Sequence, residues 1–256
     1  MKINELLPDG RITMLIDADI YLFRACSAAE FEHDWGDDVW SLTTDLKEAQ
    51  AYFKKSIEEF QQELGIEDFL LCITSTDNFR KDVLPEYKSN RKGTRKPVGY
   101  KALVDWAKEE YPYFMLPKLE ADDVMGILQT TKGKETYIVS DDKDMMTIAG
   151  RLYQPQKKIK LNLTETEANQ WFYRQTLTGD TVDGYAGIKG IGPKKADGII
   201  ASSCTWRNVE ATYLKHGYTQ KEALQQARCA RICRSTEYDL TTNTLKLWEP
   251  SHDEHN

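Results

Sequence analysis

The sequence is poor in histidine and has no long apolar run, and both absences narrow the class of protein. Its 256 residues include four histidines and five cysteines. The cysteines lack zinc-finger spacing and their number is odd, which fits a reducing compartment. No run of about 18 apolar residues is present, so no membrane-spanning helix is expected. The start, MKINELLPDG, lacks the apolar core of a secretion signal, and we therefore expect a cytoplasmic protein with no membrane partner.

The net charge is −7, but positive charge is concentrated in two places. Segment 80–101 holds eight basic residues against Asp82 and Glu86, which gives a local charge of +6. The eight are Arg80, Lys81, Lys88, Arg91, Lys92, Arg95, Lys96 and Lys101. A second basic group lies in a glycine-rich turn and consists of Lys189, Lys194 and Lys195. Charge separated in this way predicts one positive surface and one negative pocket.

Apolar strands alternate with amphipathic helices along the first two thirds of the chain. The predicted strands are 12–18, 69–76 and 136–140, with a strand or hairpin over 151–163. The predicted helices are 20–30, 45–64, 99–111 and one that begins near Glu120. This alternation is typical of an α/β fold with a mostly parallel central sheet wrapped by helices.

The last third of the chain reads as mainly helical. Capping boxes at Thr164–Glu167 and Thr219–Glu222 predict helices that run to about Leu177 and Arg234. We therefore expect two domains, an α/β domain over 1–163 and a helical lobe over 164–256.

Nine carboxylates follow predicted strands, open a predicted helix or precede the glycine-rich turn. They are Asp17, Asp77, Glu120, Asp122, Asp123, Asp142, Asp144, Asp180 and Asp183. The carboxyl ends of parallel strands line one crevice, so these side chains have reason to converge. Two carboxylates about 5 Å apart repel by about 3 kcal/mol at a dielectric constant of about 20, so they protonate or bind hard cations. Oxygen ligands favour magnesium or manganese over zinc, and a metal-activated water attacks phosphate esters. Taken singly, each acid reads more simply as a surface residue.

Two of these acids stand on the buried face of a predicted helix. Glu120 and Asp123 precede Val124 and Ile127 by four residues, on the same apolar stripe. An unpaired buried charge is costly, so the pattern predicts a positive group beside them.

The glycine-rich turn has the features of a grip on a phosphate backbone. Gly187, Gly190 and Gly192 let backbone amides approach a ligand, and Pro193 suits the first turn of a following helix. Amides at a helix start attract anions, and Lys194 and Lys195 add charge. This is the form of a helix-hairpin-helix motif; the simpler interpretation is a tight turn without a ligand.

The basic segment 78–96 combines cations with Phe79 and Tyr87. Cations follow phosphates and aromatic rings stack on unpaired bases, so the segment reads as a strand-guiding element. The simpler interpretation is a solvated loop.

Together these residues resemble the 5′-nuclease, or flap endonuclease, superfamily, and within it the 5′→3′ exonucleases of short-tailed T-odd bacteriophages. The resemblance covers residues from about 12 to 249 and rests on motifs in the family's order. They are LIDADIYLFRACSAAEF, TDNFRKDVLPEYKSNRKGTRKPVGY, LEADDVMG, IVSDDKDMMTI and TGDTVDGYAGIKGIGPKKA.

The resemblance implies a PIN-like 5′-nuclease fold with a basic arch over 78–96, and a helical lobe that carries the helix-hairpin-helix motif. It implies two Mg²⁺ or Mn²⁺ ions. The first would be surrounded by Asp17, Asp77, Glu120, Asp122 and Asp123, and the second completed or flanked by Asp142, Asp144, Asp180 and Asp183. Lys88 and Arg91 would act near the scissile phosphate, and a potassium ion would sit on hairpin carbonyl oxygens. Asp19, where the family often has glycine, is an extra acid, and Asp141 is another.

The residues implied to contact DNA come from the arch and the turn. They are Arg80, Lys81, Tyr87, Lys88, Arg91, Lys92, Arg95, Lys96, Gly187, Lys189, Gly190, Gly192, Lys194 and Lys195.

The function that we expect is metal-dependent 5′→3′ hydrolysis of duplex DNA in phage replication or recombination, in the host cytoplasm. Flap-endonuclease action and cleavage of RNA in RNA–DNA hybrids are further activities that the resemblance implies. Two alternatives stay open: a non-catalytic, structure-specific DNA-binding protein, and a haloacid-dehalogenase-like phosphatase with Asp17 as nucleophile. The sequence identifies no protein partner.

Overall fold

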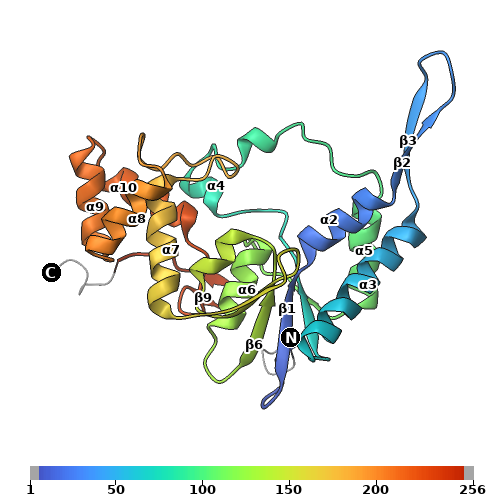
Figure 1. The fold of residues 1–256 in the computed structure, drawn as a ribbon, viewed down its shortest axis with the longest axis horizontal. Coiled ribbons are helices and arrows are strands. Elements are labelled where there is room, and N and C mark those ends of the chain that lie inside the picture. The colour runs from blue at the N-terminus through green and yellow to red at the C-terminus, as the bar shows by residue number, and fades with distance from the viewer. Residues whose placement is uncertain (1–5, 251–256) are drawn as a thin grey trace.

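A six-stranded sheet in the order β5-β4-β1-β6-β7-β8 forms the centre of the computed structural model, which describes residues 6–250 (Figure 1). The strands are β1 (Ile12–Asp17), β4 (Phe69–Cys72), β5 (Tyr113–Phe114), β6 (Glu135–Val139), β7 (Gly150–Gln154) and β8 (Ile159–Leu163). All neighbours pair in parallel except β7 and β8, which form an antiparallel hairpin. The predicted α/β class with a mostly parallel sheet is confirmed.

The described helices divide between the two faces of this sheet and a separate core. They are α2 (Ala18–Ala28), α3 (Leu46–Leu64), α4 (Arg80–Val83), α5 (Tyr100–Glu110), α6 (Ala121–Gln129), α7 (Glu165–Thr178), α8 (Pro193–Ser202), α9 (Trp206–Lys215) and α10 (Gln220–Ala230), with 3₁₀ turns η1 (Ser89–Arg91) and η2 (Lys143–Thr147). Along β1, Met14 and Ile16 face the core under α2, α3 and α5, whereas Leu15 faces the core under α6. Alternation along a strand thus feeds two separate cores. In the described residues no helix is long and apolar enough to cross a membrane.

The long helix α3 shows why the sequence folds locally as predicted. Asp45 caps its start by accepting hydrogen bonds from the backbone N–H groups of Lys47 and Glu48. Phe53, Ile57 and Phe60 form its buried stripe. Gly65 ends the helix in the left-handed conformation, with φ 66°.

Two predicted elements, β4 and α10, are shorter than expected. Near the end of each, backbone groups form hydrogen bonds with side chains. Pairing of β4 stops at Cys72 because the N–H of Thr74 donates to the Asp19 carboxylate instead of to a strand carbonyl. Helix α10 ends at Ala230, four residues before the predicted end. The chain then extends across α6, where the N–H of Cys233 donates to Asp123.

A hairpin that the sequence did not predict connects α2 to α3. It consists of β2 (Glu30–Asp34) and β3 (Trp40–Thr44), which form their own two-stranded sheet. It projects from the body at the end of the molecule opposite to α8, α9 and α10 (Figure 1).

Helices α7 to α10 pack around a third core that includes Phe172, Trp206 and Tyr213. The capping boxes at Thr164 and Thr219 start α7 and α10 as predicted. Tyr87, from the basic segment, also belongs to this core. The domain division at residue 163 remains a prediction.

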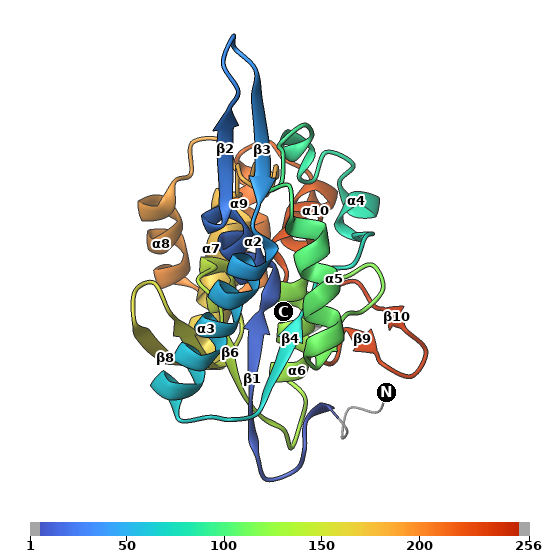
Figure 2. The same cartoon turned by 90° about the vertical axis from the view of Figure 1, so that its right-hand side faces the viewer.

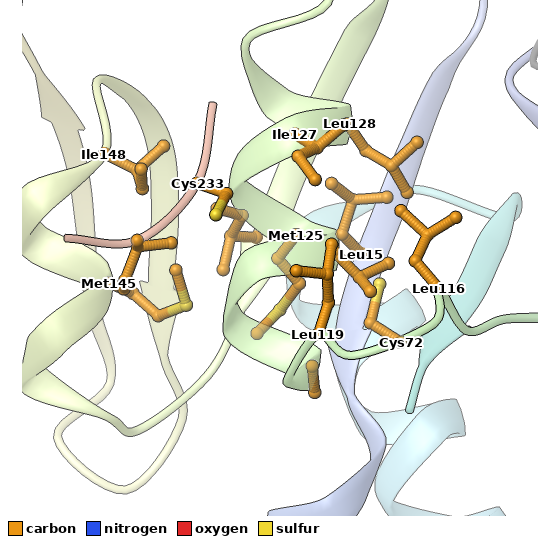
Figure 3. Close-up of a cluster of buried hydrophobic side chains, with 14 of the residues drawn as sticks. Leu15, Cys72, Leu116, Leu119, Met125, Ile127, Leu128, Met145, Ile148 and Cys233 are labelled. Atoms are coloured by element: carbon orange, nitrogen blue, oxygen red, sulfur yellow. The ribbon is translucent and has the colours of Figure 1, made fainter. Parts of the chain in front are cut away.

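Helix α6 lies between the sheet and the extended segment that follows α10 (Figure 3). Its Met125, Ile127 and Leu128 join one core with Leu15 of β1 and Cys233 of that segment. The segment approaches closely because residue 126 is glycine. A Cβ there would lie 2.5 Å from the carbonyl oxygen of Cys233 and 2.8 Å from Ile232.

We expect Gly126→Ala to lower the free energy of unfolding by about 1–3 kcal/mol, since a backbone carbonyl must move to admit the methyl group. Urea denaturation measures this change. The matched control is Gly198→Ala in α8, where no atom lies within 4 Å of the added Cβ. There the higher helix propensity of alanine should raise stability by up to about 1 kcal/mol. Equal effects at both positions would contradict the packing described.

Candidate active site

Asp17 lies at the junction of β1 and α2, and its carboxylate is enclosed by the protein. One oxygen accepts a hydrogen bond from Ser140 Oγ at 2.7 Å, and the other faces the N–H of Ile20 at 3.4 Å. Burial raises the pKa of Asp17 to about 7, and repulsion from Asp19 and Asp142 acts in the same direction.

Asp142 and Asp144 follow the neighbouring strand β6. Ser140 Oγ, which holds Asp17, also accepts from the N–H of Asp142 at 3.1 Å. The N–H of Asp144 donates to Asp142 Oδ1 at 2.8 Å, so Asp142 caps η2. Burial raises the pKa of both carboxyl groups, that of Asp144 to about 7, where the Asp142 charge adds to the effect.

Asp122, in the first turn of α6, completes this group. Burial, and then the charges of Asp142 and Asp17, raise its pKa well above the ordinary value. We call Asp17, Asp122, Asp142 and Asp144 the carboxylate group. Its four members come from three elements that meet at the carboxyl ends of adjacent strands, as the sequence predicted.

Glu120 and Asp123 have the positive partner that their position on the buried face predicted. The partner is Arg80, whose side chain is 3% exposed and forms two hydrogen bonds to Asp123, at 2.7 and 2.8 Å. Its Nη1 lies 3.3 Å from Glu120. Arg80 also donates to the carbonyl oxygens of Cys229 and Arg231. A buried side chain has no surface for a nucleic acid, so the contact with DNA expected of Arg80 is not available in this structure.

Glu120 is held from the arch side as well. The hydroxyl group of Tyr87 lies 3.0 Å from a carboxylate oxygen of Glu120 and 2.8 Å from one of Asp183. Lys88 forms salt bridges with the same two acids. Although burial opposes it, Arg80 and Lys88 lower the pKa of Glu120 to about 2. Tyr87 is buried between the acids, so it too lies away from any surface on which a base could stack.

Asp183 and Asp180 lie on the far side of the site, in the loop after α7. Arg91 of the arch pairs with Asp183 at 2.7 Å. Lys143 pairs with Asp180 at 2.7 Å. Burial opposes ionisation of Asp180, yet Lys143 and the N–H groups of Val182 and Asp183 lower its pKa. Every acid in this loop is thus already matched by a cation.

The structure separates Asp77 from the other predicted acids. Asp77 is exposed, and in the described part of the chain no hydrogen bond or ion pair holds its carboxylate. Asp19 stands closer to the carboxylate group: it accepts from the N–H of Thr74 at 3.1 Å, and its charge acts on Asp17. Burial raises the pKa of Asp19. The other extra acid, Asp141, turns away to pair with Arg24.

Three residues that support the site were not predicted. Ser140 bridges Asp17 and Asp142, Lys143 pairs with Asp180, and the Gln175 side chain on α7 donates to Asp144. Ser140 and Lys143 lie close in sequence to Asp142 and Asp144, so their place near the site could have been predicted. Gln175 had none, since only the packing of α7 against η2 brings it near.

The donor set fits a hard cation in its chemistry. The carboxylate group offers oxygen ligands, and burial and neighbouring carboxylates raise their pKa values, so a cation among them would favour their charged form. As the side chains stand, no three acids, histidines or cysteines in the described residues form a set close enough to hold one ion. The fit therefore rests on charge and ligand type.

The glycine-rich turn presents its cations to solvent. Lys189, Lys194 and Lys195 are exposed, and α8 begins at Pro193 as predicted. Gly187 has φ 60° and packs so closely on Gly179 that a Cβ would lie 2.3 Å from its nitrogen. Gly190 has φ 84° with open space around it, and Gly192 is also exposed.

The arch cations are exposed too, except Arg80 and Lys88. Lys81, Lys92 and Lys96 face solvent, and exposed Arg95 makes two hydrogen bonds with Glu30, at 2.7 and 2.8 Å. The arch contains only the short elements α4 and η1, and the rest of it is an extended connection to α5 (Figure 1). Exposed cations of the arch and of the glycine-rich turn thus stand apart from the carboxylate group, whose members are buried or half-buried.

Comparisons with known proteins agree with the resemblance seen in the sequence. The family model described as 5′-3′ exonuclease, N-terminal resolvase-like domain, matches residues 12–173. The exodeoxyribonuclease of Enterobacteria phage T3 is 30% identical, and the match covers 94% of each chain. The exonuclease of Escherichia phage T7 is also 30% identical, over 94% of this chain and 95% of its own.

A solved structure shows the same fold at lower identity. A bacteriophage T5 flap endonuclease, in a complex with DNA and metal ions, has a TM-score of 0.65 at 17% identity. The match covers 88% of this chain and 90% of that chain.

Arg80→Met should lower the free energy of unfolding by about 3–5 kcal/mol, because Asp123 would be left charged and unpaired inside the protein. Chemical denaturation of the metal-free protein gives the value. The control is Arg11→Met, which breaks an exposed pair with Asp68 and should cost at most about 1 kcal/mol. Adding Asp123→Asn to Arg80→Met should recover part of the loss. A single-variant cost as small as that of the control would disprove the role given to Arg80.

Proposed function

This chain belongs to the 5′-3′ exonuclease family, and we propose that its carboxylate group holds the divalent metal ions with which it hydrolyses DNA from 5′ ends. The chain is a nuclease with 5′-3′ exonuclease function. The observation that carries the metal proposal is the crowding of Asp17, Asp122, Asp142 and Asp144 at the carboxyl ends of the strands, where burial and then neighbouring carboxylates raise their pKa values.

We propose two Mg²⁺ or Mn²⁺ ions. Asp17, Asp122 and Glu120 would hold or flank one ion, and Asp142, Asp144, Asp180 and Asp183 would hold or flank the other. When bound, the metals would activate a water molecule and stabilise the leaving oxygen. Metal ions in the T5 relative's complex support the dependence. A potassium ion at the glycine-rich turn is part of the same proposal.

The chain's own residues orient the groups around that chemistry. Ser140 and Gln175 fix the carboxylates of Asp17 and Asp144 by direct hydrogen bonds. Lys88 and Arg91 end beside Glu120 and Asp183, at the edge of the site where the arch passes. Their positive charge would attract and orient the scissile phosphate there. Asp17 and Asp144, with pKa values near 7, would release protons when cations arrive.

The substrate that we propose is duplex DNA with a 5′ end. The exposed lysines of the glycine-rich turn and of the arch would follow the backbone, and the T5 relative's complex contains DNA. Flaps and RNA–DNA hybrids are further proposed substrates, with a role in phage replication. The phosphatase alternative fits poorly, because both oxygens of Asp17 face hydrogen-bond donors and its side chain is buried.

A duplex labelled at one 5′ end should release short labelled products in Mg²⁺ or Mn²⁺ and none in chelator. Duplex carrying a 5′ flap and RNA–DNA hybrid, assayed in parallel, define the substrate range. Asp142→Ala should reduce cleavage at least about 100-fold, because it removes a central ligand, and leave DNA binding without metal intact. Normal cleavage by Asp142→Ala would contradict the proposed metal site and favour the alternative of a non-catalytic DNA-binding protein. Release from 3′ ends alone would overturn the polarity.

A matched pair of variants tests whether Asp19 or Asp77 contributes to metal binding next to Asp17. Asp19→Asn should weaken Mn²⁺ binding, measured by electron paramagnetic resonance, because this carboxylate lies beside Asp17. Asp77→Asn should leave Mn²⁺ binding unchanged, because Asp77 is exposed and apart. The reverse result would restore Asp77 to the site.

The metal-free protein should lose stability as the pH rises from about 4 to about 7. The pKa values of Asp17 and Asp144 are raised in the folded state, so the folded protein binds more protons than the unfolded chain in this range. Glu120 has a lowered pKa, so its contribution is already complete above about pH 4.5 and stays constant. Urea titrations in chelator between about pH 5 and pH 8 measure the decline, and saturating Mn²⁺ should flatten it. A flat or rising profile in chelator would show that the pKa values of Asp17 and Asp144 are not raised in the folded protein.

A further inference from the structure

The β2–β3 hairpin has no part in the site described, yet it is firmly attached to the body. Glu30 accepts from Arg95 and from the N–H of Val98, and Thr44 Oγ1 accepts from the N–H of Gly99. Beyond this base its two strands pair only with each other in the described structure. Both views show it projecting beyond the helices (Figures 1 and 2).

The projecting part carries large apolar side chains in solvent. Trp35 is 70% exposed, Trp40 59% and Val39 56%, and Phe31 is also exposed. A two-stranded hairpin gains little stability from such residues, and exposed aromatic groups of this size mark interaction sites more often than ordinary surface.

These side chains are arranged in a fixed order. Phe31 and His33 stand opposite Thr43 and Ser41, so their rings share one face. The ring centroids of Phe31 and His33 lie 4.9 Å apart, and those of His33 and Trp35 lie 5.8 Å apart. Trp35 Nε1 donates to Ser41 Oγ at 2.8 Å, which holds the outermost ring in place. Rings ordered in advance lose little entropy when a partner covers them.

The negative charge of the hairpin favours a partner with positive charge. Residues 30–44 contain five acids and no lysine or arginine, namely Glu30, Glu32, Asp34, Asp37 and Asp38. Only Glu30 forms a salt bridge in the described residues. Proteins that stack aromatic groups on single-stranded DNA combine them with positive charge, which is missing here. Five acids would also repel the hairpin of a second copy.

We propose that the hairpin is a docking arm for a partner protein that presents an apolar groove bordered by lysine or arginine. Trp35, which continues the ring row of Phe31 and His33, fills the groove. The acids of β2 lie on the other face of the hairpin, where Trp40 stands opposite Asp34, and there they and Trp40 meet the rim of the groove. Tryptophan at the centre of an interface and complementary charge around it are the usual sources of affinity and of fast association. Because the arm and α8 lie at opposite ends of the molecule, a docked partner leaves the glycine-rich turn free (Figure 1).

The test begins with the full chain carrying the photoreactive residue p-benzoylphenylalanine in place of Trp35. It is irradiated in extract of the cells that produce it, after digestion of nucleic acid. The proposal requires a cross-link to a protein that mass spectrometry identifies and that binds this chain when both are purified. Trp35→Ala and Trp40→Ala should each weaken that binding at least about tenfold. Glu32→Gln with Asp34→Asn should weaken it and reduce its salt dependence.

Controls separate docking from folding and from catalysis. Tyr52→Ala removes an exposed aromatic side chain from α3 and should leave partner binding unchanged. The tryptophan variants should keep the wild-type urea midpoint and release nucleotides from a 5′-labelled duplex at the wild-type rate. Loss of docking with normal cleavage thus distinguishes this proposal from the proposed function.

Four results would overturn the proposal. They are no cross-link, a cross-link to a second copy of this chain, a cross-link to nucleic acid in undigested extract alone, and a purified partner that binds the alanine variants as well as wild type.

Discussion

Like charges brought together where water is excluded are stable only if opposite charge or protons accompany them. Asp17, Asp122, Asp142 and Asp144 are brought together because the carboxyl ends of β1 and β6 and the start of α6 meet at one edge of the parallel sheet. The other residues of the site either offset this negative charge with a cation or leave it to be offset by protonation. Cations lower the pKa of Glu120 and Asp180 against the effect of burial, whereas burial and neighbouring carboxylates raise the pKa values of Asp17, Asp122, Asp142 and Asp144.

Acids that are paired with a cation of the protein and acids that are not have different roles. Arg80 neutralises Asp123 permanently in the interior and thereby ties the arch to α6 and to the end of α10. Among the described residues no salt bridge pairs Asp17, Asp122, Asp142 or Asp144, and burial raises their pKa values. The same structure thus separates acids that stabilise the fold from acids that we propose as metal ligands, although the sequence shows one continuous motif over 120–123.

The sequence predicted the elements whose patterns are local. The caps of α3, α7 and α10 and the strand β1 follow from neighbouring residues, and the need of Glu120 and Asp123 for a cation followed from their apolar stripe. Which cation answers that need depends on the path of the chain over 40 residues, and the sequence placed Arg80 on DNA instead. Gln175 reaches Asp144 only through the packing of α7 on η2. The β2–β3 hairpin escaped prediction because its apolar residues face water, so no buried face gave its strands a pattern.

The hydrogen bonds of Arg80 and Asp123 to the backbone of Cys229, Arg231 and Cys233 tie the end of α10 and the segment after it to the nuclease core. These partners are separated by 110 to 151 positions in the sequence. A chain cut before Cys229 would lack two acceptors of Arg80 and the segment that packs on α6. The support beneath the acids therefore depends on a part of the chain that contributes no acid to the site.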